Sequence, residues 1–155
     1  MKDTDTPPVQ HIGEFVLTKN GNLDFGEIPS EIAKVIRRQE GKIRLRIGVE
    51  IDNATGNYGE KHIERPERME ALKKCGFINA RDFIEDVCGN YNAIYQGEKG
   101  SLILVKTNAK KNHIAIVKLI PSEIGDFYDV QTGYPSRKSG KNKKPLLWKC
   151  QSERS

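Results

Sequence analysis

The sequence predicts an α+β domain in which a small helical unit packs on an antiparallel sheet of four to five strands. Segments with helical periodicity come first and segments with strand periodicity follow, and one late segment, 114–120, is apolar on both of its faces. The length of 155 residues fits one domain. We expect residues 41–150 to form this domain, and residues 1–40 to form an N-terminal extension with one short helix, a candidate docking segment.

Weak strand signals at 11–17 and a turn at 19–22 come first, and a helix and a strand follow them. Pro29 and Ser30 open a helix that Gly41 ends, with an apolar stripe made by Ile32, Val35 and Ile36. Residues 42–51 then alternate in character, as expected for a half-buried strand. The apolar residues of this run share one face, and the other face carries Arg44, Arg46 and Glu50.

Two more helices and four strands follow. Pro66 begins a helix that runs to about Lys74 and is capped by Gly76, and Asn79 caps the next helix, whose apolar side carries Phe83, Ile84 and Val87. The predicted strands are 92–95, 102–105, 113–120 and 127–134, and hairpin turns at 96–100 and 108–112 separate the first three.

Arg44, Arg46 and His62 are the first candidates for chemistry. Two arginines on one sheet face form a phosphate site, because guanidinium groups match phosphate oxygens in pairs. His62 lies just before the helix that begins at Pro66, near the bases Arg65 and Arg68. An imidazole titrates near neutrality and can both take and return a proton. A surface histidine in a turn would give the same pattern.

The end of the last predicted strand and the tail that follows it form a second candidate region. The Thr132 hydroxyl could hold a phosphate oxygen, and the Tyr134 ring could stack on a base. Strict alternation turns Thr132 inward together with Val130, unless the strand is bulged. The basic residues that follow are either a nucleic-acid footprint or a solvated tail: Arg137, Lys138, Lys141, Lys143 and Lys144.

Several classes of protein find no support in the sequence. The three cysteines lack CxxC spacing, so the sequence indicates neither a disulfide-rich scaffold nor a zinc site. Reduced cysteines in the cytoplasm fit this pattern. No phosphate-binding loop and no nucleophile elbow is present, and no carboxylate spacing indicates a metal site. We expect no cofactor, no metal and no membrane association, since no apolar run approaches membrane-spanning length.

In sequence order, these blocks resemble the phage and polymorphic-toxin nuclease domains of the barnase–EndoU–colicin–RelE superfamily. The resemblance covers roughly residues 41–148. It is carried by GKIRLRIG (41–48), YGEKHI (58–63), FIEDV (83–87), IY (94–95), LILV (102–105), AIV (115–117), DFYDVQTGYP (126–135) and LLW (146–148). Where the family pattern often has a second histidine soon after the first, this chain has Arg65 and Pro66.

The resemblance implies a metal-independent endoribonuclease that cleaves tRNA or other single-stranded RNA. It places the catalytic histidine at His62, basic residues of the sheet at Arg44 and Arg46, and a hydroxyl and an aromatic residue at Thr132 and Tyr134. The 2′-OH would attack its own phosphodiester and leave a 2′,3′-cyclic phosphate. A cognate immunity or antitoxin protein would be the partner, and the cytoplasm of the producing or target bacterial cell the location.

Two alternatives stay open at this point. The chain could be a nucleic-acid-binding module without catalysis, in which the arginines and the basic tail hold phosphates. It could also be a structural or interaction module of a phage particle or a secreted toxin, with a merely solvated tail. Salt-sensitive binding without cleavage would indicate the first, and neither binding nor cleavage would indicate the second.

Overall fold

The computed structural model describes residues 7–51, 56–108, 111–137 and 144–150. Its helices are α1 (Ser30–Ile36), α2 (Gly59–Ile63), α3 (Pro66–Lys74), α4 (Ala80–Asn90) and the 3-10 turn η2 (Glu98–Gly100). Its strands are β1 (His11–Ile12), β2 (Phe15–Val16), β3 (Gly26–Ile28), β4 (Gly41–Arg46), β5 (Ala93–Gln96), β6 (Leu102–Thr107), β7 (Lys111–Ile120), β8 (Phe127–Arg137) and β9 (Leu146–Lys149). No helix in these ranges is long and apolar enough to cross a membrane.

One sheet of nine strands organises the described residues and confirms the α+β class. Its order is β1-β2-β4-β8-β7-β6-β5-β9, with β3 also paired to β4. We expected an antiparallel sheet of four to five strands, but the sheet is larger, with nine strands. It is also mixed rather than antiparallel, because β4 and β8 are parallel, with Ile43 opposite Tyr128. Between β4 and β8 the chain forms three α-helices and three strands. A connection of this length allows β8 to enter the sheet in the same direction as β4. Strands from the first forty residues join this sheet through β4.

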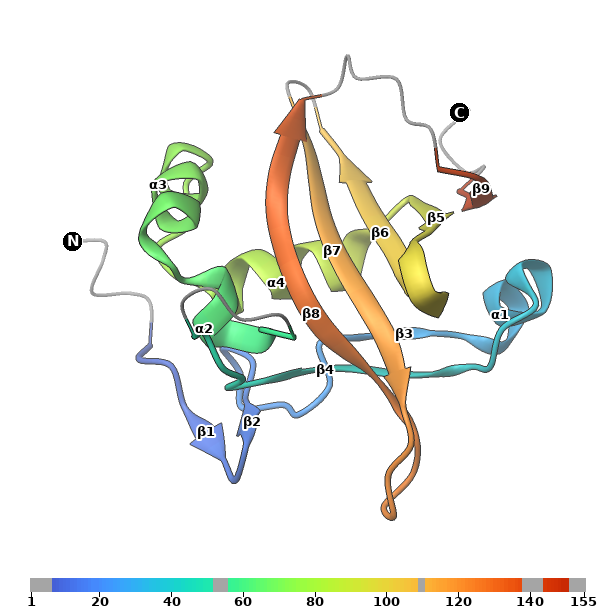
Figure 1. Ribbon diagram of the computed structural model, residues 1–155, viewed down its shortest axis with the longest axis horizontal. Coiled ribbons are helices and arrows are strands. Elements are labelled where there is room, and N and C mark those ends of the chain that lie inside the picture. The colour runs from blue at the N-terminus through green and yellow to red at the C-terminus, as the bar shows by residue number, and fades with distance from the viewer. Residues whose placement is uncertain (1–6, 52–55, 109–110, 138–143, 151–155) are drawn as a thin grey trace.

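The main helix covers one face of the sheet. In Figure 1, α4 crosses behind β6, β7 and β8, and it contacts all three strands. The predicted apolar side of α4 is fully buried at Phe83, Ile84 and Val87, which confirms that assignment. Asn79 caps the helix as predicted, because its Oδ1 accepts a 2.8 Å hydrogen bond from the Asp82 amide. Burial of this stripe removes apolar surface from water and fixes α4 on the sheet.

Two predicted elements end earlier than expected. The helix α1 stops at Ile36 rather than near Gly41, because Arg37 adopts a left-handed conformation (φ +61°), and Val35 is exposed rather than part of the apolar stripe. The strand β4 ends at Arg46 and not at residue 51, because Gly48 has φ +76°. A Cβ at Gly48 would lie 1.9 Å from the carbonyl oxygen of Tyr58, so the chain turns there.

A bulge in β8 determines where Thr132 points. Ile116 of β7 lies opposite Thr132, whereas the next residue, Val117, lies opposite Val130, so Gln131 is the extra residue. Val130 and Gly133 face the core, and Thr132 faces the side of the sheet that α4 does not cover. The bulge therefore allows a buried Val130 and an outward Thr132 in one strand.

Candidate functional site

The candidate site lies where α2 and α3 pack against the upper part of β8. The strand β4 pairs with β8 only near Tyr128 and Asp129, so the rest of that edge is open to the helices. The helix α2 is short and carries His62 in its last turn, and Pro66 starts α3 four residues later. The expected turn before α3 is thus partly helical. This arrangement places His62 at a sharp corner beside the sheet.

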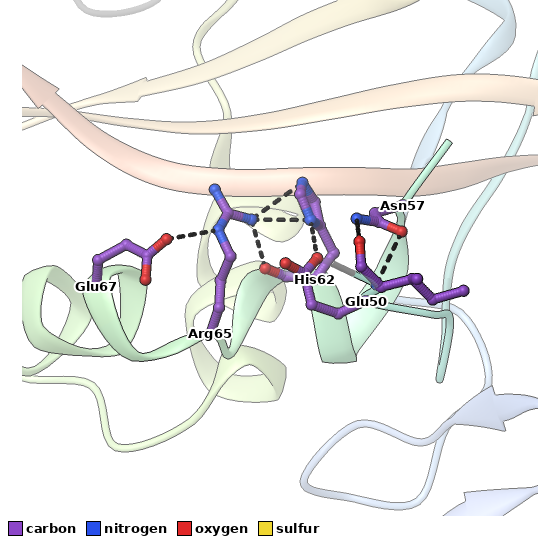
Figure 2. A network of polar contacts seen from close by, with 6 residues as sticks. Glu50, Asn57, His62, Arg65 and Glu67 are labelled. Atoms are coloured by element: carbon purple, nitrogen blue, oxygen red, sulfur yellow. Dashed lines mark hydrogen bonds and ion pairs between the residues drawn. The ribbon is translucent and has the colours of Figure 1, made fainter. Parts of the chain in front are cut away.

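His62 contacts a carboxylate on one side and a guanidinium on the other. Its Nδ1 lies 2.7 Å from Oε1 of Glu50, and its side chain is 22% exposed. Nη1 of Arg65 lies 2.8 Å from Nδ1 and 3.0 Å from Nε2, and it donates a 2.6 Å hydrogen bond to the His62 carbonyl oxygen. Figure 2 shows the imidazole between Glu50 and Arg65. The imidazole is therefore oriented, and both of its nitrogens have neighbours.

Glu50 is positioned by the short loop that follows β4. Val49 and Tyr58 exchange backbone hydrogen bonds of 3.0 and 3.2 Å, which close the base of the loop. The Asn57 side chain bonds both the amide and the carbonyl of Ile51 at 3.1 Å (Figure 2). The sequence placed Glu50 on the polar side of the 42–51 run but did not indicate its histidine partner. That pairing arises because the chain turns back at Gly48.

Arg65 and Arg68 bring two positive charges to the same corner. Arg65 is paired with Glu67 at 3.2 Å, a carboxylate whose side chain is 73% exposed. The guanidinium carbon of Arg68 lies 4.2 Å from the centre of the Tyr134 ring on β8. In the described residues, no carboxylate forms an ion pair with Arg68. Burial and then the charge of Arg65 lower the pKa of Arg68, which means that an anion here would relieve unfavourable electrostatics.

Thr132 shares the site-facing side of β8 with Tyr134. Its Oγ1 is buried and has no hydrogen-bond partner. An unpartnered buried hydroxyl typically costs about 1–3 kcal/mol, so such atoms are uncommon in folded proteins. A ligand reaches this oxygen only when neighbouring side chains shift.

Arg44 and Arg46 lie on the predicted face of β4, but carboxylates hold both of them. The Nε and Nη2 atoms of Arg46 each donate a 2.9 Å hydrogen bond to Asp129, which is completely buried. The guanidinium of Arg46 also lies 4.4 Å from the centre of the Tyr58 ring. Arg44 donates a 2.8 Å hydrogen bond to Asp24. In this structure these arginines connect β4 to Asp24 and to Asp129 of β8 through ion pairs.

The basic tail is described only at its two ends. Arg137 is exposed at the end of β8, and Lys144 lies 3.1 Å from Glu98. Lys138, Lys141 and Lys143 lie outside the described residues. Of the residues predicted from the sequence, the structure places His62 against Arg65 and Arg68 against Tyr134, and it adds Glu50 as the partner of His62. Thr132 lies on the same side of β8 as Tyr134, but its hydroxyl forms no hydrogen bond with any of these groups.

The other two histidines occupy different settings. His113 is 5% exposed between Phe77 and Phe83, as expected for a structural residue, and burial lowers its pKa. His11 lies 3.1 Å from Glu60 in the N-terminal part of the chain. Comparison with known proteins adds nothing to this assignment, because no family model, curated protein or solved structure matches the chain.

Proposed function

We propose that the protein is a metal-independent endoribonuclease of the barnase–EndoU–colicin–RelE type that cleaves tRNA or other single-stranded RNA. The observation that carries this proposal is the pairing of His62 with Glu50, together with two guanidinium groups: Arg65, which contacts the imidazole, and Arg68, which forms no ion pair in the described residues. A proton-transfer group beside a site for an anion is the minimum that phosphodiester cleavage requires. The resemblance in sequence supports the same activity.

His62 would act as the general base. With Nδ1–H directed at the Glu50 carboxylate, Nε2 is the basic nitrogen, and it would accept the proton of the RNA 2′-OH. The 2′ oxygen then attacks the adjacent phosphorus, and the bond from phosphorus to the 5′ oxygen breaks. The leaving 5′ oxygen takes a proton from water, and the products are a 2′,3′-cyclic phosphate and a 5′-hydroxyl.

Arg65 and Arg68 would bind the phosphate and stabilise the charge of the transition state. Arg65 now contacts Nε2, so it must move toward the phosphate before His62 can act. Removal of one preorganised donor commonly costs about 2.7–4 kcal/mol of transition-state stabilisation, and we expect a loss of this order for Arg68 rather than for Arg65. Arg44 and Arg46, which the sequence suggested for this role, would instead support the sheet, since each is held by a carboxylate.

The experiment for this proposal is incubation of total tRNA with purified protein in the presence of EDTA, followed by a denaturing gel. We expect discrete fragments with the wild type and none with His62→Ala. His11→Ala is the matched control, because His11 lies in β1 and is also paired with a glutamate, Glu60 of α2, so it removes a histidine that contacts the same helix as His62 but not His62 itself. Intact RNA with the wild type, or equal fragments with His62→Ala, would contradict the proposal.

A second candidate is RNA binding without cleavage. It is favoured by one observation, namely that both ring nitrogens of His62 have close neighbours in this conformation. In that case Arg65, Arg68 and the basic tail would hold phosphates, and RNA binding would weaken steeply with salt while the RNA stays intact.

A further inference from the structure

A row of side chains crosses the open face of the sheet, beginning at the candidate site. The strand register places Thr132 opposite Ile116, Ile116 opposite Ile103, and Ile103 opposite Tyr95. Because opposite residues in a sheet share a face, these four side chains form one line across β8, β7, β6 and β5. Three strand spacings of about 4.8 Å make this line about 14 Å long.

This face is open to a ligand. In Figure 1, α4 lies behind β6, β7 and β8, and α2 and α3 lie beside β8, which they contact. No α-helix in the described part of the chain is drawn in front of β5, β6 or β7. All four residues of the row are partly exposed, whereas their neighbours Ile94 and Leu104 are fully buried on the α4 side. The exposed parts of the two isoleucines and of the tyrosine give this row apolar surface against which unpaired bases can pack.

We propose that this row, Thr132–Ile116–Ile103–Tyr95, is a stacking surface for the unpaired bases of an RNA strand that leaves the catalytic site. This proposal rests on the proposed function, because it takes its direction from the phosphate site at Arg68. A stacked strand rises about 3.4 Å per nucleotide, so the row accommodates about four nucleotides. The Tyr95 ring at the far end supplies the aromatic surface on which a base stacks irrespective of its sequence.

The charges at the two ends of the row suit a single strand rather than an apolar protein segment. Arg68 lies over Tyr134 at the β8 end. The row adjacent to the proposed surface runs from Tyr134 through Ile114 and the buried Val105 and Ala93, and it ends at Lys149, which is exposed on β9. These two cations lie at the ends of the neighbouring row, one residue pair away from the proposed surface, where they could contact the phosphates of a strand whose bases stack on it.

The test is the affinity for a fluorescein-labelled 2′-O-methyl RNA of ten nucleotides, measured by fluorescence anisotropy. This probe cannot be cleaved by 2′-OH attack, so binding is measured separately from catalysis. We expect Tyr95→Ala to bind it about tenfold more weakly than the wild type, since one stacked base contributes on the order of 1.4 kcal/mol. Tyr95→Phe keeps the ring and should bind within about twofold of the wild type.

The controls separate stacking from charge and from misfolding. Ile124→Ala removes an exposed apolar side chain that lies outside the row and should leave affinity unchanged. A blunt RNA duplex exposes no unpaired bases, so Tyr95→Ala should bind it like the wild type. Thermal melting of each variant shows that it is folded.

The outcomes distinguish this inference from the proposed function. The stacking proposal would be overturned, even if RNA is cleaved, by either of two results. One is a folded Tyr95→Ala variant that binds the probe with wild-type affinity, and the other is an equal loss of affinity for the probe and for the duplex. Failure of the wild type to bind the probe at low salt would also overturn it. A tenfold loss limited to the single strand would support the surface even if no RNA is cleaved.

Discussion

The ion pair between Arg46 and Asp129 allows a structural role of Arg46 to be separated from a catalytic one. Asp129 is completely buried, and Arg46 approaches it with two hydrogen bonds of 2.9 Å. Arg46→Met would leave the buried carboxylate with one remaining side-chain donor, Gln131 Nε2 at 2.7 Å. Removal of one partner of a buried pair costs about 3–5 kcal/mol, and we expect the lower end because that donor remains.

The measurement is equilibrium unfolding in urea, followed by circular dichroism. A loss of about 3 kcal/mol lowers the midpoint by about 1.5 M, if m is about 2 kcal/mol per M. The double variant Arg46→Met/Asp129→Leu replaces the pair with apolar side chains and should unfold within about 1 kcal/mol of the wild type. Its RNA cleavage should stay within about threefold of the wild type.

Two results would refute this reasoning. A loss below about 1 kcal/mol in Arg46→Met would mean that the pair does not support the fold. A stable double variant with cleavage reduced more than about a hundredfold would mean that Arg46 takes part in the reaction, as the sequence first suggested.

Three further predictions concern single side chains. Glu50→Gln should lower kcat/KM for RNA about tenfold without a change in melting temperature, because an amide holds the imidazole tautomer less firmly; an unchanged rate would remove Glu50 from the site. Thr132→Val should raise the free energy of unfolding by about 1 kcal/mol, since it removes an unpartnered buried hydroxyl. It should also lower the rate of RNA cleavage if this hydroxyl holds a phosphate oxygen, and a lower stability in urea would contradict the first expectation. Burial lowers the pKa of His113, so the unfolded chain binds a proton at higher pH than the folded one, and stability falls as pH drops below about 6.5. His113→Phe should therefore lose less stability than the wild type between pH 7 and 5, and equal losses would show that another group is responsible.

Local signals in the sequence predicted α1, α3 and α4 and most of the strands, but not α2. Asn79 and Pro66 are placed by hydrogen-bonding and backbone constraints that act within a few residues, so the starts of α4 and α3 could be predicted. Phe83, Ile84 and Val87 fall on one face of an α-helix, so their burial could be predicted as well.

Features that depend on distant partners could not be predicted. The parallel pairing of β4 with β8 joins residues more than eighty positions apart, and β9 exists because it pairs with β5. The pairing of Glu50 with His62 depends on the turn at Gly48, which interrupts an otherwise regular strand pattern. The bulge at Gln131 has no local signal in the sequence, so the sequence alone does not determine which way Thr132 points.

Attack by the 2′-OH is the central claim, and the chemistry of the product ends tests it most directly. An RNA oligonucleotide that contains a mapped cleavage site is compared, in EDTA, with the same oligonucleotide carrying a 2′-deoxy nucleotide at that site. We predict 2′,3′-cyclic phosphate and 5′-hydroxyl ends from the RNA, and no cleavage at the deoxy position. Products with 5′-phosphate ends, or equal cleavage of the deoxy substrate, would contradict the mechanism proposed for His62.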